Sequence, residues 1–411
     1  RVRPSGAALH LDLFERPAGC VRMLEGSGPA TLWAPRGPAL GVYVHVPFCV
    51  KRCGYCSFNT AVFLDAAVPR YLAALAREID LAAGAPWAAA VPISTIFFGG
   101  GTPSLLTPPQ LVSVLEHLRA RLAVAPDAEI TVECNPESAS PERLVGYRAA
   151  GVTRISLGVQ SLDDRVLASL DRAHSASGAR AAFEAARRAG FDNVSTDLIY
   201  GLPGLDLATW ETTVRGLLDW EPDHLSAYGL TLDEGSRWHA TGITGLPAED
   251  PVTEQYRVLA RRAAETGFEH YEISNYARPG RRSAHNQIYW RAEEYLALGP
   301  GACGFLGDIR YGNVKATDRY CAMLEAGTLP IATHETLTAR QRLAERLLLG
   351  LRLSEGVPDA WLAERVALEP GRLPTLLDSW RERSLLVSGG GRSHLTEAGF
   401  LLSDALFVEL L

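Results

Sequence analysis

Three cysteines with the spacing CxxxCxxC are the residues of this sequence best suited to chemistry. Cys49, Cys53 and Cys56 directly follow the apolar, β-prone run 41–46. Soft thiolates select zinc ions or iron–sulfur clusters. Because a four-iron cluster usually has four cysteine ligands, three cysteines would leave one iron open to a ligand that the protein does not supply. The motif therefore predicts an iron–sulfur cluster with one open coordination position.

A zinc site is the competing interpretation of the same loop. His45 lies close enough in the sequence to supply a fourth zinc ligand. No second C-x-x-C or H-x-x-H pair follows downstream, however, and the loop leaves a strand where a barrel keeps its chemistry. The remaining cysteines are interpreted as small buried apolar residues, and they are Cys20, Cys134, Cys303 and Cys321.

Composition narrows the class of protein and its partners. The 411 residues are enough for two or three domains. A net charge of -7 argues against a nucleic-acid partner, which would need a basic face. No apolar run is long enough to span a membrane, and no signal-peptide pattern opens the sequence. Seven cysteines, three of them clustered, favour metal ligation in a reducing compartment, so we expect a cytoplasmic protein.

The elements that position the cysteines alternate between strand and helix from Gly41 onward. Three helices end at a glycine that is followed by a mostly apolar strand, at Gly151, Gly190 and Gly267. Helix, glycine stop and strand in succession are typical of a parallel βα sheet. The pattern predicts six or seven such units and therefore an α/β fold, a partial (β/α)6 TIM-like barrel.

The sequence divides into four predicted parts. Residues 1–40 form an N-terminal extension, 41–275 the partial barrel and 276–335 a less regular bridging segment. Residues 336–411 contain an amphipathic helix, further helices and a hairpin, which predicts a mostly helical, winged-helix-like domain. Because this domain lacks a basic recognition helix, a lid or docking role is favoured over DNA binding.

Polar residues at the ends of successive predicted strands are candidates for a site beside the cysteine loop. Glu133, Gln160 and Asp197 lie at strand ends, and Arg172 lies shortly after one. In a βα barrel such residues point into the active site. The run 99–101 is all glycine and directly follows a buried strand, so it is expected to offer free N–H groups to an anion.

Taken together, these motifs resemble the radical S-adenosylmethionine (SAM) superfamily and, within it, the HemN-like branch. The resemblance extends from about Gly41 to the end of the sequence. The matching motifs are 43–49 (YVHVPFC), the three-cysteine loop, 99–103 (GGGTP), 158–161 (GVQS), 172–174 (RAH) and 197–204 (DLIYGLPG).

The resemblance implies a 4Fe–4S cluster on Cys49, Cys53 and Cys56, with SAM on the open iron. It implies cleavage of SAM to a 5′-deoxyadenosyl radical, with an electron donor such as flavodoxin or ferredoxin. Arginine suits a carboxylate, and carboxylates suit an ammonium group or ribose hydroxyls. The positions that the resemblance assigns to SAM are Tyr43, Tyr55, Gly100, Gly101, Thr102, Glu133, Gln160, Arg172 and Asp197.

Three activities occur among the proteins that the sequence resembles. The oxygen-independent coproporphyrinogen oxidases carry a further cysteine where this sequence has Phe58, so that activity is the least expected. The run 285–290 (HNQIYW) matches a motif linked to heme in HemW-type heme chaperones, and His285, Tyr289 and Cys303 are the candidate heme or substrate contacts. The motif could equally be a buried histidine among aromatic residues.

Two departures from the chaperone pattern lead us to expect a class C radical methyltransferase. Ser57 stands where chaperones carry aspartate, and Cys303 where they carry histidine. Such an enzyme would methylate an sp2 carbon of an aromatic or azole substrate, a small molecule or a modified peptide. Its second SAM, the methyl donor, is expected near Ala227, Gly299 and Gly301.

Overall fold

A computed structural model describes residues 22–23 and 31–410 of the chain. Its centre is a run of six neighbouring parallel strands, each paired with the next in the order of the sequence. The sheet that contains them has two edge strands, so it is open, as a partial barrel requires. The α/β fold predicted from the sequence is confirmed. The six strands are β2 (Leu40–Val46), β5 (Ile93–Gly100), β6 (Val124–Cys134), β7 (Arg154–Gln160), β8 (Val194–Tyr200) and β9 (His224–Gly229).

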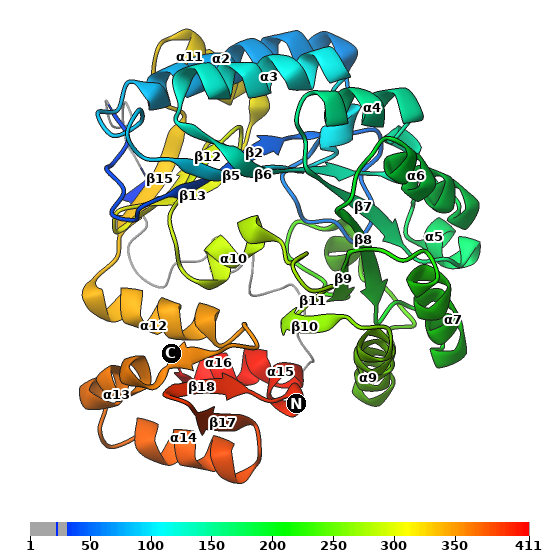
Figure 1. Ribbon diagram of the computed structural model, residues 1–411, viewed down its shortest axis with the longest axis vertical. Helices are drawn as coiled ribbons and strands as arrows, with labels where there is room; N and C mark the ends of the chain where they lie inside the picture. Colours follow the sequence, from blue (N-terminus) through cyan, green and yellow to red (C-terminus); the bar gives the residue numbers. More distant parts are fainter. Residues whose placement is uncertain (1–21, 24–30, 411) are drawn as a thin grey trace.

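Helices cover the outer face of these strands (Figure 1). Local sequence determines where several of them begin and end. Thr107 and Gln110 form a capping box at the start of α3, with a hydrogen bond of 2.8 Å from the Thr107 N–H to Oε1 of Gln110. Gly151 and Gly190 have positive φ angles of 94° and 90°, as their place after a helix predicted. The helices are α2 (Val68–Ala83), α3 (Pro108–Arg121), α4 (Pro141–Ala149), α5 (Asp164–Ser169), α6 (Ala176–Arg188), α7 (Leu207–Leu218), α8 (Arg237–Thr241) and α9 (Glu249–Glu265).

The third glycine-terminated unit differs from the prediction. After Gly267 the chain forms β10 (Glu269–Glu272), which turns back into β11 (Asn275–Ala277). The two strands are antiparallel, and β11 pairs antiparallel with β9. The expectation of a further parallel strand near residues 270–274 is therefore wrong. The chain reverses within two residues, so the returning strand occupies the edge of β9.

The bridging segment is more regular than predicted. It adds β12 (Tyr295–Leu298) parallel to β2, and three antiparallel strands extend the sheet beyond it. The short strand β1 (Arg22–Met23) pairs with the last of them. The other elements of this segment are β13 (Cys303–Leu306), β14 (Ile309–Asn313), β15 (Ile331–Thr336), α10 (Ala284–Trp290) and α11 (Thr317–Glu325).

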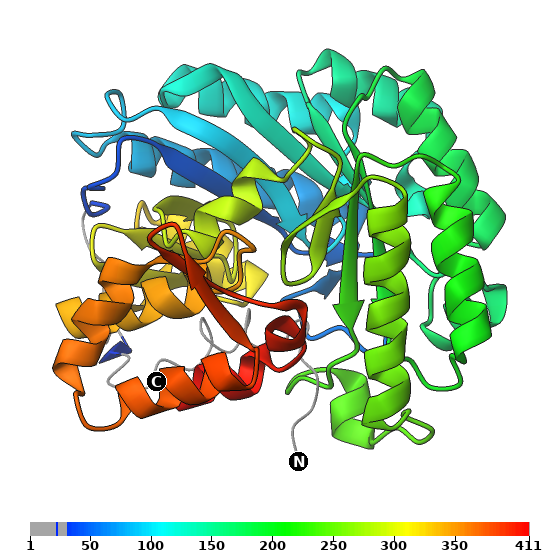
Figure 2. The same cartoon turned by 60° about the horizontal axis from the view of Figure 1, so that its bottom comes forward.

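The C-terminal elements pack around an apolar cluster of their own, separate from the core of the main sheet (Figure 2). The predicted hairpin is present as β17 and β18, and β16 adds a third strand that was not predicted. The elements are α12 (Ala339–Gly350), β16 (Val357–Pro358), α13 (Asp359–Leu368), α14 (Leu373–Glu382), β17 (Leu386–Gly389), β18 (Arg392–Leu395), α15 (Glu397–Leu401) and α16 (Ser403–Leu410). We retain the four-part division of the chain as a proposal.

Part of the predicted N-terminal extension packs on the main sheet. Leu32 is buried, and the Trp33 ring lies 5.6 Å from that of Tyr311. The rest of the extension, residues 1–21 and 24–30, which includes Cys20, lies outside the described residues. No helix in the described part of the chain has the length and apolar character needed to cross a membrane.

Candidate functional site

The cysteine loop leaves the end of β2 and is held at its base by backbone pairing. Cys49 ends β3 (Phe48–Cys49), which pairs in parallel with β4 (Ala61–Val62). Cys53 and Cys56 lie on the loop between these two strands, and all three thiols are half-buried and form no disulfide. The Thr102 hydroxyl donates to Cys49 Sγ at 3.5 Å, and Arg172 Nη1 donates to Cys53 Sγ at 3.9 Å. Donors of this kind favour thiolates.

The three thiols are better suited to binding a metal cluster than to acting singly as acid or base groups. Burial raises the pKa of Cys56 to about 11 and also raises the pKa of Cys49, so these thiols keep their protons until a metal replaces them. Among the described residues, no three His, Cys, Asp or Glu side chains meet closely enough to hold one metal ion. A four-iron cluster is bound at separate iron atoms, so its cysteines need not meet at a point. The donor set, with one ligand fewer than the irons, fits such a cluster.

His45, the fourth ligand that a zinc site would need, is engaged in other hydrogen bonds in the structure. His45 Nδ1 lies 3.0 Å from the Tyr43 hydroxyl, and His45 Nε2 lies 2.8 Å from the Asn59 carbonyl oxygen. Both ring nitrogens are thus engaged, and burial lowers the pKa of His45 to about 4. His45 instead ties Tyr43, in the middle of β2, to the cysteine loop through Asn59.

The glycine run brings the end of β5 against the cysteine strand but does not offer free N–H groups. The N–H of Gly100 donates to Glu133 Oε2 at 3.2 Å. The N–H groups of Gly101 and Thr102 donate to the carbonyls of Val46 and Phe48 at 2.8 and 2.7 Å. The expectation of free N–H groups for an anion is therefore wrong. A Cβ atom on Gly101 would lie 2.6 Å from the Phe48 carbonyl oxygen, so close backbone approach explains this glycine.

Two half-buried carboxylates, Glu133 and Asp197, lie on strands of the parallel run. Glu133 lies one residue before the end of β6, and Asp197 lies in the middle of β8. Burial raises the pKa of Glu133 to about 8, with a further contribution from the charge of Asp197. Burial also raises the pKa of Asp197, against the hydrogen bonds of Ser226 and Ser156, whose hydroxyl lies 3.1 Å from Asp197 Oδ1. Such a pair is suited to a cationic ligand.

Arg172 hydrogen-bonds both to residues at the ends of β6 and β7 and to a cysteine of the loop. Its Nη2 donates to Asn135 Oδ1 at 2.7 Å and to the Gly158 carbonyl at 2.9 Å, while Nη1 reaches Cys53. Gln160 ends β7 with a φ angle of 64°, which is unusual for a residue other than glycine and typical of functional sites.

Sequence reasoning missed the partners that hold these groups. Asn135 and Ser156 were not predicted as site residues. Asn135 follows β6 directly, and Ser156 points to the same face as the end of β7 because alternate residues of a strand share a face. The alternation along β7 was the available signal.

The residues predicted for a second SAM are not brought together. Ala227 is buried in the core beyond the sheet, because Ser226, its neighbour in β9, faces Asp197 and successive residues point to opposite faces. Gly299 and Gly301 follow β12, which pairs with β2 at the opposite end of the parallel run from β9, and they pack against His45 and Asn59. The N–H of Gly299 donates to Glu78 Oε2 at 2.7 Å, and that of Gly301 donates to the Val314 carbonyl at 2.9 Å. A second SAM at these positions is not supported.

The HNQIYW motif lies at the other end of the strands from the cysteines. His285, on α10, is fully buried, and its Nδ1 lies 2.7 Å from Oγ1 of Thr95, near the start of β5. Its Nε2 lies 2.8 Å from the Tyr289 hydroxyl, and its ring stacks on Phe97 at 5.1 Å. With both nitrogens engaged, His285 holds α10 against the sheet. Cys303, at the start of β13, is half-buried.

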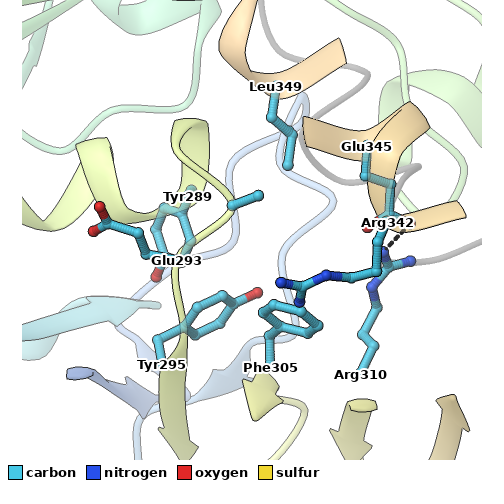
Figure 3. A pocket seen from close by; sticks show the side chains of 9 residues that line it. Tyr289, Glu293, Tyr295, Phe305, Arg310, Arg342, Glu345 and Leu349 are labelled. Carbon is cyan, nitrogen blue, oxygen red and sulfur yellow. Dashed lines mark hydrogen bonds and ion pairs between the residues drawn. The ribbon is translucent and has the colours of Figure 1, made fainter. Parts of the chain in front are cut away.

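A pocket beside Tyr289 lies between α10, the strands β12 to β14 and α12 (Figure 3). Tyr295, Phe305 and Leu349 supply apolar walls. The Arg342 guanidinium lies over the Phe305 ring, 4.7 Å from its centroid, while Arg310 is paired with Glu345. The pocket is thus aromatic, with Arg310, Arg342 and Glu345 on one side and Glu293 on the other (Figure 3).

Comparison with known proteins places this geometry among radical SAM proteins. Residues 43–217 match the model of the radical SAM superfamily. The heme chaperone HemW of Mycobacterium tuberculosis (strain ATCC 25618 / H37Rv) is 42% identical over 91% of this chain and 95% of its own length. The heme chaperone HemW of Bacillus subtilis (strain 168) is 34% identical over 89% of this chain and 97% of its own. The structure of coproporphyrinogen III oxidase (HemN) from Escherichia coli superposes with a TM-score of 0.81 at 24% identity, over 91% of each chain.

The expectation of a class C methyltransferase is wrong. Relatives that match over nearly the whole chain are named heme chaperones, whereas the expectation rested on single residues, Ser57 and Cys303. Neither departure disturbs the site. Ser57 donates to Asp233 Oδ2 at 3.3 Å, and Cys303 is a regular residue of β13, paired with Gly312.

Proposed function

We propose that this chain, which belongs to the HemN-like branch of the radical S-adenosylmethionine superfamily, is a heme chaperone that binds heme and passes it to acceptor proteins. Membership of the superfamily implies a 4Fe–4S cluster and SAM. The observation that carries the proposal is the similarity to relatives named heme chaperone over more than nine tenths of both chains. The HNQIYW motif, kept intact in this sequence, supports it.

We propose that Cys49, Cys53 and Cys56 hold the cluster. When bound, the cluster would supply an open iron for the amino and carboxylate groups of SAM. Arg172, which already donates to Cys53, is suited to the SAM carboxylate. The half-buried pair Glu133 and Asp197 is suited to a cationic or hydroxyl-bearing part of SAM. Their raised pKa values mean that a cation would favour the ionised carboxylates.

For heme, we propose an approach at the pocket beside Tyr289, which must open to admit a porphyrin because its cavity of about 30 Å³ has room for little more than water and Arg342 covers the Phe305 ring. The rings of Tyr295 and Phe305 suit the face of a porphyrin, and Arg342 suits a propionate. Tyr289 and Cys303 are candidate iron ligands. His285 could reach the iron only by giving up its hydrogen bond to Thr95 or to Tyr289.

The proposed partners are a heme acceptor protein and an electron donor such as flavodoxin or ferredoxin. A reducing compartment such as the cytoplasm is proposed because the described cysteines form no disulfide and three of them are needed as thiolates.

Heme titration of the full chain, reconstituted anaerobically with cluster and SAM, tests the proposal. The expected result is a heme complex that survives gel filtration and shows a distinct Soret band. Variants Tyr289→Phe and Cys303→Ser would identify the axial ligand through changes in the Soret position. A chain that binds SAM but retains no heme would contradict the chaperone function.

A further inference from the structure

A segment distant in the sequence lies against the cysteine loop. It consists of residues 230–241, which follow β9 and include α8, and it is called the strap here. The backbone N–H of Trp238 donates to the Gly54 carbonyl at 2.9 Å. Arg52 Nη2 donates to the Gly235 carbonyl at 3.0 Å. The loop between the cysteines is thus bonded to a segment about 180 residues away in the chain.

Side chains add further ties between the strap and the cysteine loop. Ser57 Oγ donates to Asp233 Oδ2 at 3.3 Å, directly after Cys56. The ring of Tyr55 lies edge-on to that of Trp238, 6.0 Å between centroids. Trp238 is buried although the strap lies at the surface. The two segments therefore touch on both sides of Cys53 and up to the residue after Cys56.

Gly54 is the position where the two segments come closest. A Cβ atom at Gly54 would lie 2.2 Å from Trp238 Nε1, a distance that would force the strap away. Gly54 lies in the turn closed by the hydrogen bond from Cys56 to Cys53, but its φ angle is not among the positive ones, so the close approach of the strap explains the glycine.

Asp171, which belongs to neither segment, forms ion pairs with both the strap and the cysteine loop. Its Oδ1 accepts from Lys51 Nζ at 2.7 Å, and its other oxygen pairs with Arg237 of the strap. The next residue is Arg172, which donates to Cys53 Sγ. Asp171 has a φ angle of 60°, a conformation that residues other than glycine rarely adopt. Two adjacent residues thus fix the strap and a cluster thiol.

We propose that the strap is a positioning element for the three-cysteine loop and slows the loss of iron from the cluster. Partners that hold metal ligands in place commonly change metal affinity by about 10-fold to 100-fold when they are removed. Exposed ion pairs such as those of Asp171 contribute little to global stability. The effect is therefore expected in the retention of the cluster and not in the melting temperature. This inference rests on the cluster that the superfamily implies and is independent of heme delivery.

The test uses the full chain with its cluster reconstituted under anaerobic conditions. Iron release to the ferrous chelator ferrozine is followed in wild type and in the variants Asp171→Asn and Trp238→Ala. Trp361→Ala, in the C-terminal domain, is the matched control. We expect roughly tenfold faster release in both strap variants, wild-type release in the control and an altered electron paramagnetic resonance spectrum of the reduced cluster.

Melting of the cluster-free proteins shows whether each variant is folded. If Trp238→Ala does not fold, Asp171→Asn, a surface change, decides the question alone. Wild-type rates of iron release and a wild-type spectrum in folded Asp171→Asn would overturn the proposal. A wild-type chain that takes up no cluster would overturn both this proposal and the cofactor assignment, whereas loss of heme binding alone would count only against the chaperone function.

Discussion

The two ends of the parallel strands carry polar residues of opposite character. Toward the end that holds the cysteine loop, Glu133 and Asp197 are half-buried carboxylates, and the charge of Asp197 adds to the rise in the pKa of Glu133. At the other end, the rings of His285 and His224 are fully buried, and each has both nitrogens engaged by neighbouring side chains. The carboxylates at one end have raised pKa values, whereas each of the two histidines at the other end has both ring nitrogens engaged.

This difference separates a site from a structural network. Buried polar groups that satisfy one another stabilise and specify a fold, whereas buried carboxylates with raised pKa values are suited to a ligand. A histidine within a motif associated with heme would suggest a ligand by its residue type alone. Its surroundings indicate a structural role, and the carboxylates and thiols indicate the binding site.

The largest expected effect is the loss of a cysteine at the cluster end. Cys53→Ala should abolish retention of iron and sulfide, since a cluster already short of one protein ligand would lose a second. Iron and sulfide content and charge-transfer absorbance after anaerobic reconstitution measure this. Cys321→Ser, a change at a buried cysteine outside the loop, should retain the cluster. Equal cluster content in the two variants would contradict the assignment of Cys53, and not Cys321, as a cluster ligand.

Glu133→Gln should weaken SAM binding by about 10-fold to 100-fold, the usual cost of losing a hydrogen bond to a charged group. The folded-state pKa of Glu133 is raised to about 8, so the carboxyl is protonated below that pH. Affinity for the sulfonium cation should therefore rise with pH through about 8 in wild type and stay flat in the variant. Calorimetric titration between pH 7 and 9 checks both. A pH slope that persists in Glu133→Gln would assign the titration to another group.

His285→Ala and His224→Ala form a matched pair at the satisfied end. Each should reduce the free energy of unfolding by about 3 kcal/mol, because each leaves a cavity and unpaired hydroxyl groups. Denaturant unfolding measures the loss. If heme binding falls only in His285→Ala while both variants are equally destabilised, His285 contacts heme directly and the structural interpretation of this histidine is wrong.

The smallest change, Tyr289→Phe, removes only the hydroxyl that bonds to His285 Nε2. The expected cost is about 1 kcal/mol in the free energy of unfolding. Since the ring remains, the pocket should keep its shape. A much larger loss would show that the Tyr289 hydroxyl has a second role at this end of the sheet.

Local sequence patterns predicted the fold well where residues close together in the sequence determine the backbone conformation. The cysteine spacing after β2 and the glycine stops at Gly151 and Gly190 are short-range features. The reversal between β10 and β11 was missed because the sequence of a strand that follows a helix does not indicate which strand it will pair with. Strand direction is decided by neighbours distant in the sequence.

The site was predictable in its residues but not in their hydrogen bonds. Glu133 and Asp197 were identified from strand positions, yet two of the serines that bond Asp197, Ser156 and Ser226, come from neighbouring strands. The N–H groups of the glycine run were expected to be free, but Glu133 Oε2 accepts from Gly100 and the Val46 carbonyl accepts from Gly101. The expected function failed for a similar reason: Ser57 and Cys303 were weighed as isolated substitutions, although each fits its surroundings.

Heme retention by the cluster-loaded chain tests the central claim most directly. The full chain, incubated anaerobically with SAM and heme and then passed through gel filtration, should elute with heme in equimolar amount and yield no methylated product. Elution of the loaded chain without heme would contradict the account.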